Sequence, residues 1–501
     1  MAISKTTRLV ADIVTFVLTK YVTVLASGTR SFVLARWLGP ADFGLWSTYQ
    51  LVLKYADNSH LGLRHAVNRE VPIARGRGES EAAARIESVS FAWILTFGSA
   101  AALLVVAATL FLPSGPATLI YGLWITAAIV LLAQVDSFFM TLLRVNHEFR
   151  LFSQMILLME VASLAGVAIA IPLLGVTGAI GALAAAYAGL AGYFWLRKPE
   201  LVQRLTARRS LSLPHLRRLM AVGLPIVAFG YLSILATTLD RLLVLWLLDR
   251  SAFGLYSLAA TIVSLIAMLP GNVGYVLFPC LGEELGAERL ENLRQYVVDP
   301  TFIMAGLTAP LVGIATVCLP SAVGALLPQY LPVLPAMRIL LLGSFFTVLA
   351  GVSSYLLVTM TRYWQYGACL AGAAALNGVV GYLLLRQGSG LTGVAVGAAV
   401  GYAFSGCLNF SLALRALGVD PSEARRLLLG HVAPWVYNVA LLWAAGWALS
   451  GGGWLLSTTA GTPWADGLTA ALLLLLNMPI LAAVNRRGGL AARFRSVLSR
   501  A

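Results

Sequence analysis

The chain has 501 residues, of which 59% are hydrophobic and 11% are charged, and its formal net charge is +14. Soluble globular proteins carry about 25% charged residues, so this composition excludes a large soluble domain and predicts an all-α polytopic membrane protein. The positive-inside rule accounts for the excess of Lys and Arg, so the charge does not indicate nucleic-acid binding. The four cysteines lie inside apolar runs without C-x-x-C spacing, which favours packing over a disulfide or a metal site.

Apolar segments long enough to cross a bilayer recur along the whole chain. A spanning helix requires about 20 residues, and fourteen segments of this kind can be placed on the sequence. The predicted spans are 9–36, 42–68, 88–112, 117–143, 151–172, 178–196, 219–248, 253–281, 298–319, 336–361, 364–385, 391–414, 428–450 and 465–485.

The Lys and Arg residues divide unequally between the two sides of this topology. With the amino terminus in the cytoplasm, most of them fall in cytoplasmic segments, and only Arg36, Arg250 and Arg386 fall in external ones. This asymmetry predicts that both termini are cytoplasmic. The largest polar loop, 197–218, is then cytoplasmic and basic. The basic tail 486–501 either lies on anionic lipid or is a stop-transfer cluster of charges.

Charged side chains interrupt the first two spans, which Gly39-Pro40 separates. A charge at bilayer depth costs about 2.5–3.5 kcal/mol on insertion scales, so such groups normally face a protein interior or water. On helical wheels the polar residues of each span share one face. The pattern predicts a water-filled cavity with a positive wall, whose cations are Lys20, Arg30, Lys54 and Arg64.

An internal repeat divides the chain. Residues 21–47 match 231–257 at eight positions with an offset of 210, and Gly175-Val-Thr-Gly178 is echoed by Gly390-Leu-Thr-Gly393. A six-helix repeat enters the membrane in one direction both times, which predicts two parallel lobes around a central cavity, plus two extra helices. The predicted domains are an N-terminal lobe (1–200), a basic cytoplasmic linker (201–218), a C-terminal lobe (219–416), two additional transmembrane helices (427–485) and a basic cytoplasmic tail (486–501).

The two copies differ in charge. At the repeat offset Arg30 aligns with Asp240 and Lys54 with Ser264, so the first lobe is cationic, while the second keeps one acid beside Arg241. One interpretation is that Arg30 and Asp240 pair across the pseudo-twofold axis in one access state. The other is that Asp240 neutralises Arg241 locally, since buried charges often pair with a neighbour.

Other ionisable groups lie in or beside the spans. Asp136 and Glu160 are candidates for proton or cation binding, or each is satisfied by a neighbouring helix, an interpretation that we favour for Glu160. His60 and His65 are either proton switches near neutral pH or hydrogen-bonded structural groups. The candidates for coupling or gating are Asp57, His60, Asp136, Asp240 and Arg241, and the coupling ion would be a proton or sodium.

Motifs typical of enzymes are absent from the sequence. It contains no G-x-x-x-x-G-K-[ST] phosphate loop, no G-x-S-x-G elbow, no H-E-x-x-H and no Cys/His set with metal-ligand spacing. The chain is therefore not expected to hydrolyse ATP, to hold a metal or another cofactor, or to act as an enzyme.

The junction of the first two spans reads Arg36-Trp-Leu-Gly-Pro-Ala-Asp-Phe-Gly-Leu-Trp46. An R-x-L-G-P-x-x-[FY]-G run in this place resembles the polysaccharide transport family, the O-antigen and exopolysaccharide lipid flippases of the multidrug/oligosaccharidyl-lipid/polysaccharide exporter (MOP) superfamily. The segment 149–182 is similar to that family as well. The resemblance implies a V-shaped cavity between two six-helix lobes, alternating access, and a location in the bacterial cytoplasmic membrane. It also implies an undecaprenyl-diphosphate-linked oligosaccharide as substrate, whose diphosphate binds Lys20, Arg30, Lys54 and Arg64.

The chemistry of such a substrate agrees with the residues. Its phosphates need positive charge, its sugars need hydroxyl-rich walls, and its tail needs an apolar path, for which the last two spans are a candidate. The expected partners are this substrate, membrane lipids, a polysaccharide polymerase and glycosyltransferases. One alternative is an ion-coupled multidrug exporter, which should present carboxylates where this chain presents Lys and Arg. Another is a membrane glycosyltransferase or polymerase, whose acidic catalytic loop is missing from 320–335 and 451–464.

Overall fold

The computed structural model describes the backbone of residues 5–111, 116–146, 148–207, 211–450 and 463–488. Within these ranges it describes the side chains except those of 5–21, 24, 266–276, 279–280, 448–450, 463–465 and 487–488. The elements in the described parts are all helices, which confirms the all-α prediction. A helix satisfies its backbone N–H and C=O groups within its own segment, which is what a lipid environment demands of long apolar sequences.

Many of the helices are suited to a membrane. Nine described helices are long and apolar enough to cross a bilayer, or ten if the bent pair Pro328–Ser344 and Thr347–Thr359 forms one span. Every predicted span overlaps a helix. The fifth and sixth predicted spans both lie in α5 (Phe149–Arg197), which non-helical backbone angles at Gly175 kink between them. The count of fourteen spans stays a prediction, because length and composition identify nine or ten among the described helices.

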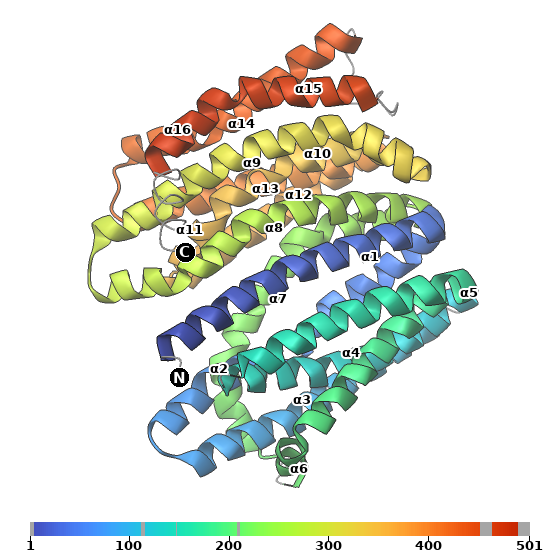
Figure 1. Cartoon of the computed structure of the whole chain (residues 1–501), viewed down its shortest axis with the longest axis vertical. Coiled ribbons are helices and arrows are strands. Elements are labelled where there is room, and N and C mark those ends of the chain that lie inside the picture. Colours follow the sequence, from blue (N-terminus) through green and yellow to red (C-terminus); the bar gives the residue numbers. More distant parts are fainter. Residues whose placement is uncertain (1–4, 112–115, 147, 208–210, 451–462, 489–501) are drawn as a thin grey trace. The chain divides into compact units, whose positions relative to one another are not determined.

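Contacts between helices divide the chain into two compact units, Met1–Ile234 and Leu235–Ala501, and the division falls inside α7 (Leu213–Leu247). In the first unit α5 packs against α1 and α4, and α3 packs against α4 (Figure 1). Besides α5 and the first part of α7, the first unit contains α1 (Lys5–Ala56), η1 (Asp57–His60), α2 (Leu63–Gly76), α3 (Ser80–Ala108), η2 (Thr109–Phe111), α4 (Ala117–Val145) and α6 (Pro199–Ala207).

The second unit is built around α13, which packs against α10, α11 and α12, while α9 carries α14, α15 and α16 on its flank (Figure 1). Its elements after α7 are α8 (Arg250–Gly286), α9 (Leu290–Leu326), η3 (Pro328–Val333), α10 (Leu334–Ser344), α11 (Thr347–Thr359), α12 (Tyr363–Arg386), α13 (Gly390–Ala416), α14 (Pro421–Ser450), α15 (Pro463–Leu476) and α16 (Met478–Gly488).

The break predicted at Gly39-Pro40 is confirmed. Gly39 adopts φ 68° and ψ 173° inside α1, so the helix axis changes direction there. Proline at the next position fixes its own φ and lacks an N–H, so Pro40 begins the second helical segment at no cost in hydrogen bonds.

The glycine echo of the repeat has a structural basis. Gly175 and Gly390 both adopt a positive φ, 58° and 54°, a backbone conformation that L side chains rarely take. Three residues later in each copy lies a second glycine with no room for a side chain. A Cβ on Gly178 would be 2.6 Å from the Ala170 carbonyl oxygen, and a Cβ on Gly393 would be 2.8 Å from the Leu384 Cβ. Each copy therefore uses the first glycine to turn the chain and the second to bring two helices close together.

The second predicted span, 42–68, is not one continuous helix, and that prediction was wrong. The chain leaves α1 at Ala56, forms the short helix η1, and passes through Leu61 (φ 48°) and Gly62 (φ 91°) before α2 begins. Gly62 lies against the backbone of Gly223 in α7, where a Cβ on Gly62 would be 2.2 Å from the Gly223 carbonyl carbon. The shared polar face inferred from a single helix therefore extends no further than α1.

A buried acid holds α2, α3 and α6 together. Glu87 of α3, with its side chain 1% exposed, accepts hydrogen bonds from Arg75 of α2 and Arg204 of α6, each at 2.6 Å. Charge-assisted bonds of this length are among the stronger contacts in a protein. They attach α6, which lies in the predicted linker, to the first unit.

Removing the carboxylate should leave two guanidinium groups facing each other. Breaking a fully buried ion pair costs about 3–5 kcal/mol, and the partial exposure of Arg75 and Arg204 reduces this figure here. We expect Glu87→Ala to lower the melting temperature of the detergent-solubilised protein by several degrees. Glu81→Ala, at an exposed position of the same helix, is the matched control, and equal melting temperatures for the two variants would contradict the role of Glu87.

Candidate functional site

An ion pair joins α1 to α5 in the first unit. The Arg30 Nη1 atom lies 3.1 Å from Glu160 Oε2, and the two side chains are only 18% and 17% exposed. The same nitrogen donates to the Ser163 hydroxyl, which in turn donates to the Glu160 carbonyl at 3.1 Å. Glu160 and Ser163 are three residues apart on α5, so they present both acceptors on one helix face.

This pairing bears on two of the sequence-based predictions. The partner found for Glu160 on a neighbouring helix agrees with the structural interpretation favoured for it. The predicted gate placed Arg30 opposite Asp240 in one access state, whereas the carboxylate beside Arg30 in this structure is that of Glu160. The pairing of Arg30 with Asp240 stays a prediction.

A second ion pair closes the turn between α1 and α2. Arg64 Nη2 lies 3.0 Å from Asp57 Oδ1 and also donates to the Asp57 carbonyl at 2.8 Å. Gln134 of α4 donates to the carbonyls of Ala56 and Asp57 at 2.8 Å and 2.9 Å. These donors satisfy carbonyl groups that the end of a helix leaves without intrahelical partners. Asp57 is the more accessible member of the ion pair, since its side chain is 55% exposed against 15% for Arg64.

His60 stabilises the same turn. Its side chain is buried, and its Nδ1 atom accepts a hydrogen bond from the Gly62 N–H at 2.9 Å. Because Nδ1 is an acceptor, the ring proton belongs on Nε2, and a doubly protonated ring would lose this bond. The His65 ring meets His60 edge-on with 5.6 Å between centroids.

The remaining predicted cations lie on α1. Lys54 is exposed in its last turn, where a positive charge complements the carbonyl end of the helix dipole. The side chain of Lys20 lies outside the described residues.

Asp136 is the most unusual acid of the first unit. Its side chain is 3% exposed in α4, and neither carboxylate oxygen has a hydrogen-bond partner among the described residues. Burial of an ionised carboxylate without compensation is costly, so such a group is normally neutral or binds a cation.

The family of the chain follows from comparison with known proteins. A sequence profile described as polysaccharide biosynthesis protein matches residues 9–284, which is more than half of the chain. The chain belongs to this family. None of the curated proteins compared with the chain matches it in sequence.

Solved transporters share its fold. A multidrug resistance MATE family transporter of the MOP superfamily, in an inward-facing conformation, aligns with a TM-score of 0.70 at 15% identity, over 83% of this chain and 99% of its own. The lipid II flippase MurJ, in an inward closed conformation, aligns with a TM-score of 0.66 at 11% identity, over 93% of this chain and 98% of its own. A MOP superfamily transporter from Pyrococcus furiosus aligns with a TM-score of 0.51 at 15% identity, over 82% of this chain and 95% of its own. The chain is therefore a multi-pass membrane protein with the fold of MOP superfamily transporters.

The second unit holds its own buried acid. Asp240 of α7 is 1% exposed and accepts a hydrogen bond from the Tyr256 hydroxyl of α8 at 2.8 Å. Arg241 follows it directly in the chain and is half-buried. Asp240 thus has a neutral donor from its own unit, an arrangement that neither sequence-based interpretation considered.

Two residues that contact the predicted site residues, Ser163 and Gln134, were not themselves predicted. The sequence could have indicated Ser163, because it follows Glu160 by about one helical turn and shares its helix face. It could not have indicated Gln134, because a single polar residue in an apolar span does not reveal which helix it will contact.

The Arg30–Glu160 pair predicts the outcome of a charge exchange. Arg30→Glu places two acids between α1 and α5, so we expect a lower melting temperature for the single variant. Adding Glu160→Arg restores opposite charges and should recover most of the loss. Additive losses in the double variant would mean that the two side chains do not interact.

Proposed function

We propose that this protein is a flippase that moves an undecaprenyl-diphosphate-linked oligosaccharide across the bacterial cytoplasmic membrane by alternating access, for O-antigen or exopolysaccharide export. The proposal is carried by one observation, that the first unit holds the guanidinium groups of Arg30 and Arg64 in ion pairs, with Glu160 and Asp57, inside a strongly apolar helical sequence. It is supported by the family, which is named for polysaccharide biosynthesis, and by a fold shared with a lipid flippase.

The two guanidinium groups can bind a diphosphate by exchanging partners. Arg30 holds Glu160 and Arg64 holds Asp57, and a diphosphate offers each guanidinium several oxygens in the bidentate geometry that it prefers. Asp57 is exposed enough to turn into water when phosphate replaces it. Displacing Glu160 would loosen a contact between α1 and α5, so substrate binding would be linked to a change in how these helices pack.

The proposal includes an orientation and a set of partners. Both termini are placed in the cytoplasm, where glycosyltransferases would supply the lipid-linked substrate. A polymerase would consume it after translocation, and membrane lipids surround the apolar helices. The fold shared with MATE transporters favours a second candidate, an ion-coupled exporter of cationic drugs. The guanidinium groups of Arg30 and Arg64 favour an anionic substrate instead.

The test is translocation in proteoliposomes with a fluorescent undecaprenyl-diphosphate N-acetylglucosamine probe. We expect wild-type protein to move the probe between leaflets, and Arg30→Ala or Lys54→Ala to slow it about tenfold or more, since hydrogen bonds to charged groups contribute about 1.5–3 kcal/mol. Arg85→Ala, at an exposed position of α3, is the matched control. Wild-type rates in both variants would remove these residues from the mechanism, and transport of ethidium in place of the lipid would support the drug exporter.

Asp136 is proposed as the site that binds the coupling proton or cation. Asp136→Asn keeps the shape of the side chain but removes the ionisable group. We expect the variant to bind the lipid probe normally while its transport no longer responds to an imposed proton or sodium gradient. Asp42→Asn, at an exposed position near the start of the second helical segment, should retain the response. A full response in Asp136→Asn would exclude this coupling role.

A further inference from the structure

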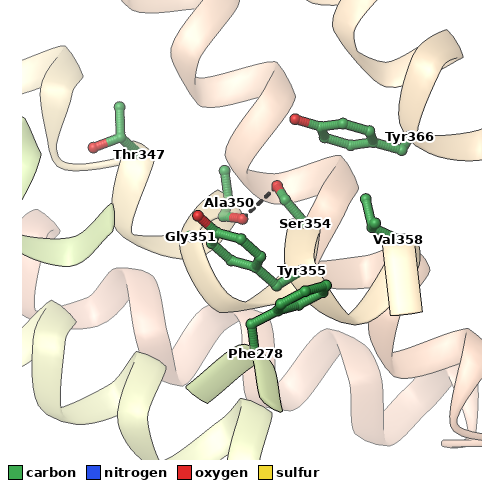
Figure 2. A pocket seen from close by; sticks show the side chains of 8 residues that line it. All are labelled: Phe278, Thr347, Ala350, Gly351, Ser354, Tyr355, Val358 and Tyr366. Carbon is green, nitrogen blue, oxygen red and sulfur yellow. Dashed lines mark hydrogen bonds between the residues drawn. The ribbon is translucent and has the colours of Figure 1, made fainter. Parts of the chain in front are cut away.

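A pocket of about 360 Å³ opens in the second unit between α8, α11 and α12. This volume falls within the range of about 300–1,000 Å³ that is typical of small-molecule sites. Figure 2 shows the eight side chains that line it, which are Phe278, Thr347, Ala350, Gly351, Ser354, Tyr355, Val358 and Tyr366.

One stripe of α11 forms the wall of the pocket. Thr347, Gly351, Ser354 and Val358 recur at intervals of three and four residues, so they share a helix face. The other face of α11 is mostly apolar and is buried in the core of the unit, where Leu349 is one of the fully buried residues. Small and hydroxylated residues on the stripe leave space that larger residues would have filled.

Aromatic rings supply the second feature of the pocket. Phe278 of α8 and Tyr355 of α11 lie side by side with 5.4 Å between centroids and 53° between planes (Figure 2). Tyr366 adds a third ring from α12. Aromatic faces carry partial negative charge, and they stack well against the C–H groups on one face of a pyranose ring.

Hydroxyl oxygens supply the third feature. The Ser354 hydroxyl donates to the Ala350 carbonyl at 2.6 Å, and the Thr347 hydroxyl donates to the Ser344 carbonyl at 2.7 Å. With their protons engaged, both oxygens keep lone pairs for a donor in the pocket. Sugar hydroxyl groups are such donors, whereas an alkyl chain would cover these oxygens without pairing them.

The eight residues that line the pocket include no Asp, Glu, Lys, Arg or His. This composition does not suit a phosphate group, which requires positive charge. The first unit, by contrast, holds the ion pairs Arg30–Glu160 and Arg64–Asp57. We propose that the pocket binds an uncharged pyranose residue of the transported glycan, so that different residues of the chain recognise the sugar and the diphosphate. This inference rests on the proposed function.

The experiment measures binding of two probes to the full-length protein in nanodiscs. One probe is undecaprenyl diphosphate, and the other is the same lipid bearing one N-acetylglucosamine residue. We expect wild-type protein to bind the sugar-bearing probe about tenfold more tightly, the order of magnitude that aromatic contacts provide. Tyr355→Ala should reduce this advantage to about twofold or less, while the dissociation constant for undecaprenyl diphosphate stays unchanged.

Two further variants make the result interpretable. Ala350→Leu narrows the pocket from the non-core face of α11, so it should abolish the sugar advantage without disturbing the core. Tyr382→Ala removes a tyrosine of α12 that does not line the pocket, and it should keep the advantage.

Failure of the inference and failure of the proposed function give different results. Equal binding of the two probes by wild-type protein, or a sugar advantage that survives in both pocket variants, overturns the sugar site and leaves the flippase proposal standing. Weaker binding of both probes in Ala350→Leu would indicate a lipid chain in the pocket and also overturns the sugar site. If neither probe binds wild-type protein, both proposals are wrong.

Discussion

The first unit depends on keeping charge inside an apolar helical bundle at an acceptable cost. Arg30 meets this requirement with an acid on α5, Arg64 with an acid in its own turn, and Glu87 with two arginines from different elements. Each pair links segments that apolar packing alone would leave free to slide, because lipid solvates apolar helix surfaces as well as protein does. The polar groups therefore serve both as the contacts that fix helix positions and as the chemistry available to a substrate.

The helical architecture was accessible from the sequence because it follows from composition and spacing. Apolar length predicts helices, and glycine followed by proline predicts the break at Gly39. The repeated Gly-x-Thr-Gly pattern marks two equivalent turns, at Gly175 and Gly390, which the backbone angles confirm. The sequence did not predict the break at Gly62. The break coincides with a backbone contact to Gly223, and these two residues are far apart in the chain.

The partners of the candidate site were harder to predict than its members. Arg30 and Asp240 were identified as unusual residues, but an internal repeat aligns positions without saying what each one contacts. The structure pairs Arg30 with Glu160 and gives Asp240 a tyrosine hydroxyl. The pocket beside Tyr355 was not predicted at all, because serine, threonine and glycine on one helix face are equally typical of close helix packing.

The path of α7 has a consequence for motion. The part of α7 up to Ile234 belongs to the first unit, and the part from Leu235 onward belongs to the second unit. In the first part, Gly223 touches Gly62 through the backbone. Pro225 lies two residues further on and removes one backbone hydrogen bond from the helix, so α7 bends most easily there. Bending of α7 would therefore take place inside the first unit, beside the Gly62–Gly223 contact, and not at residue 234 where the two units divide.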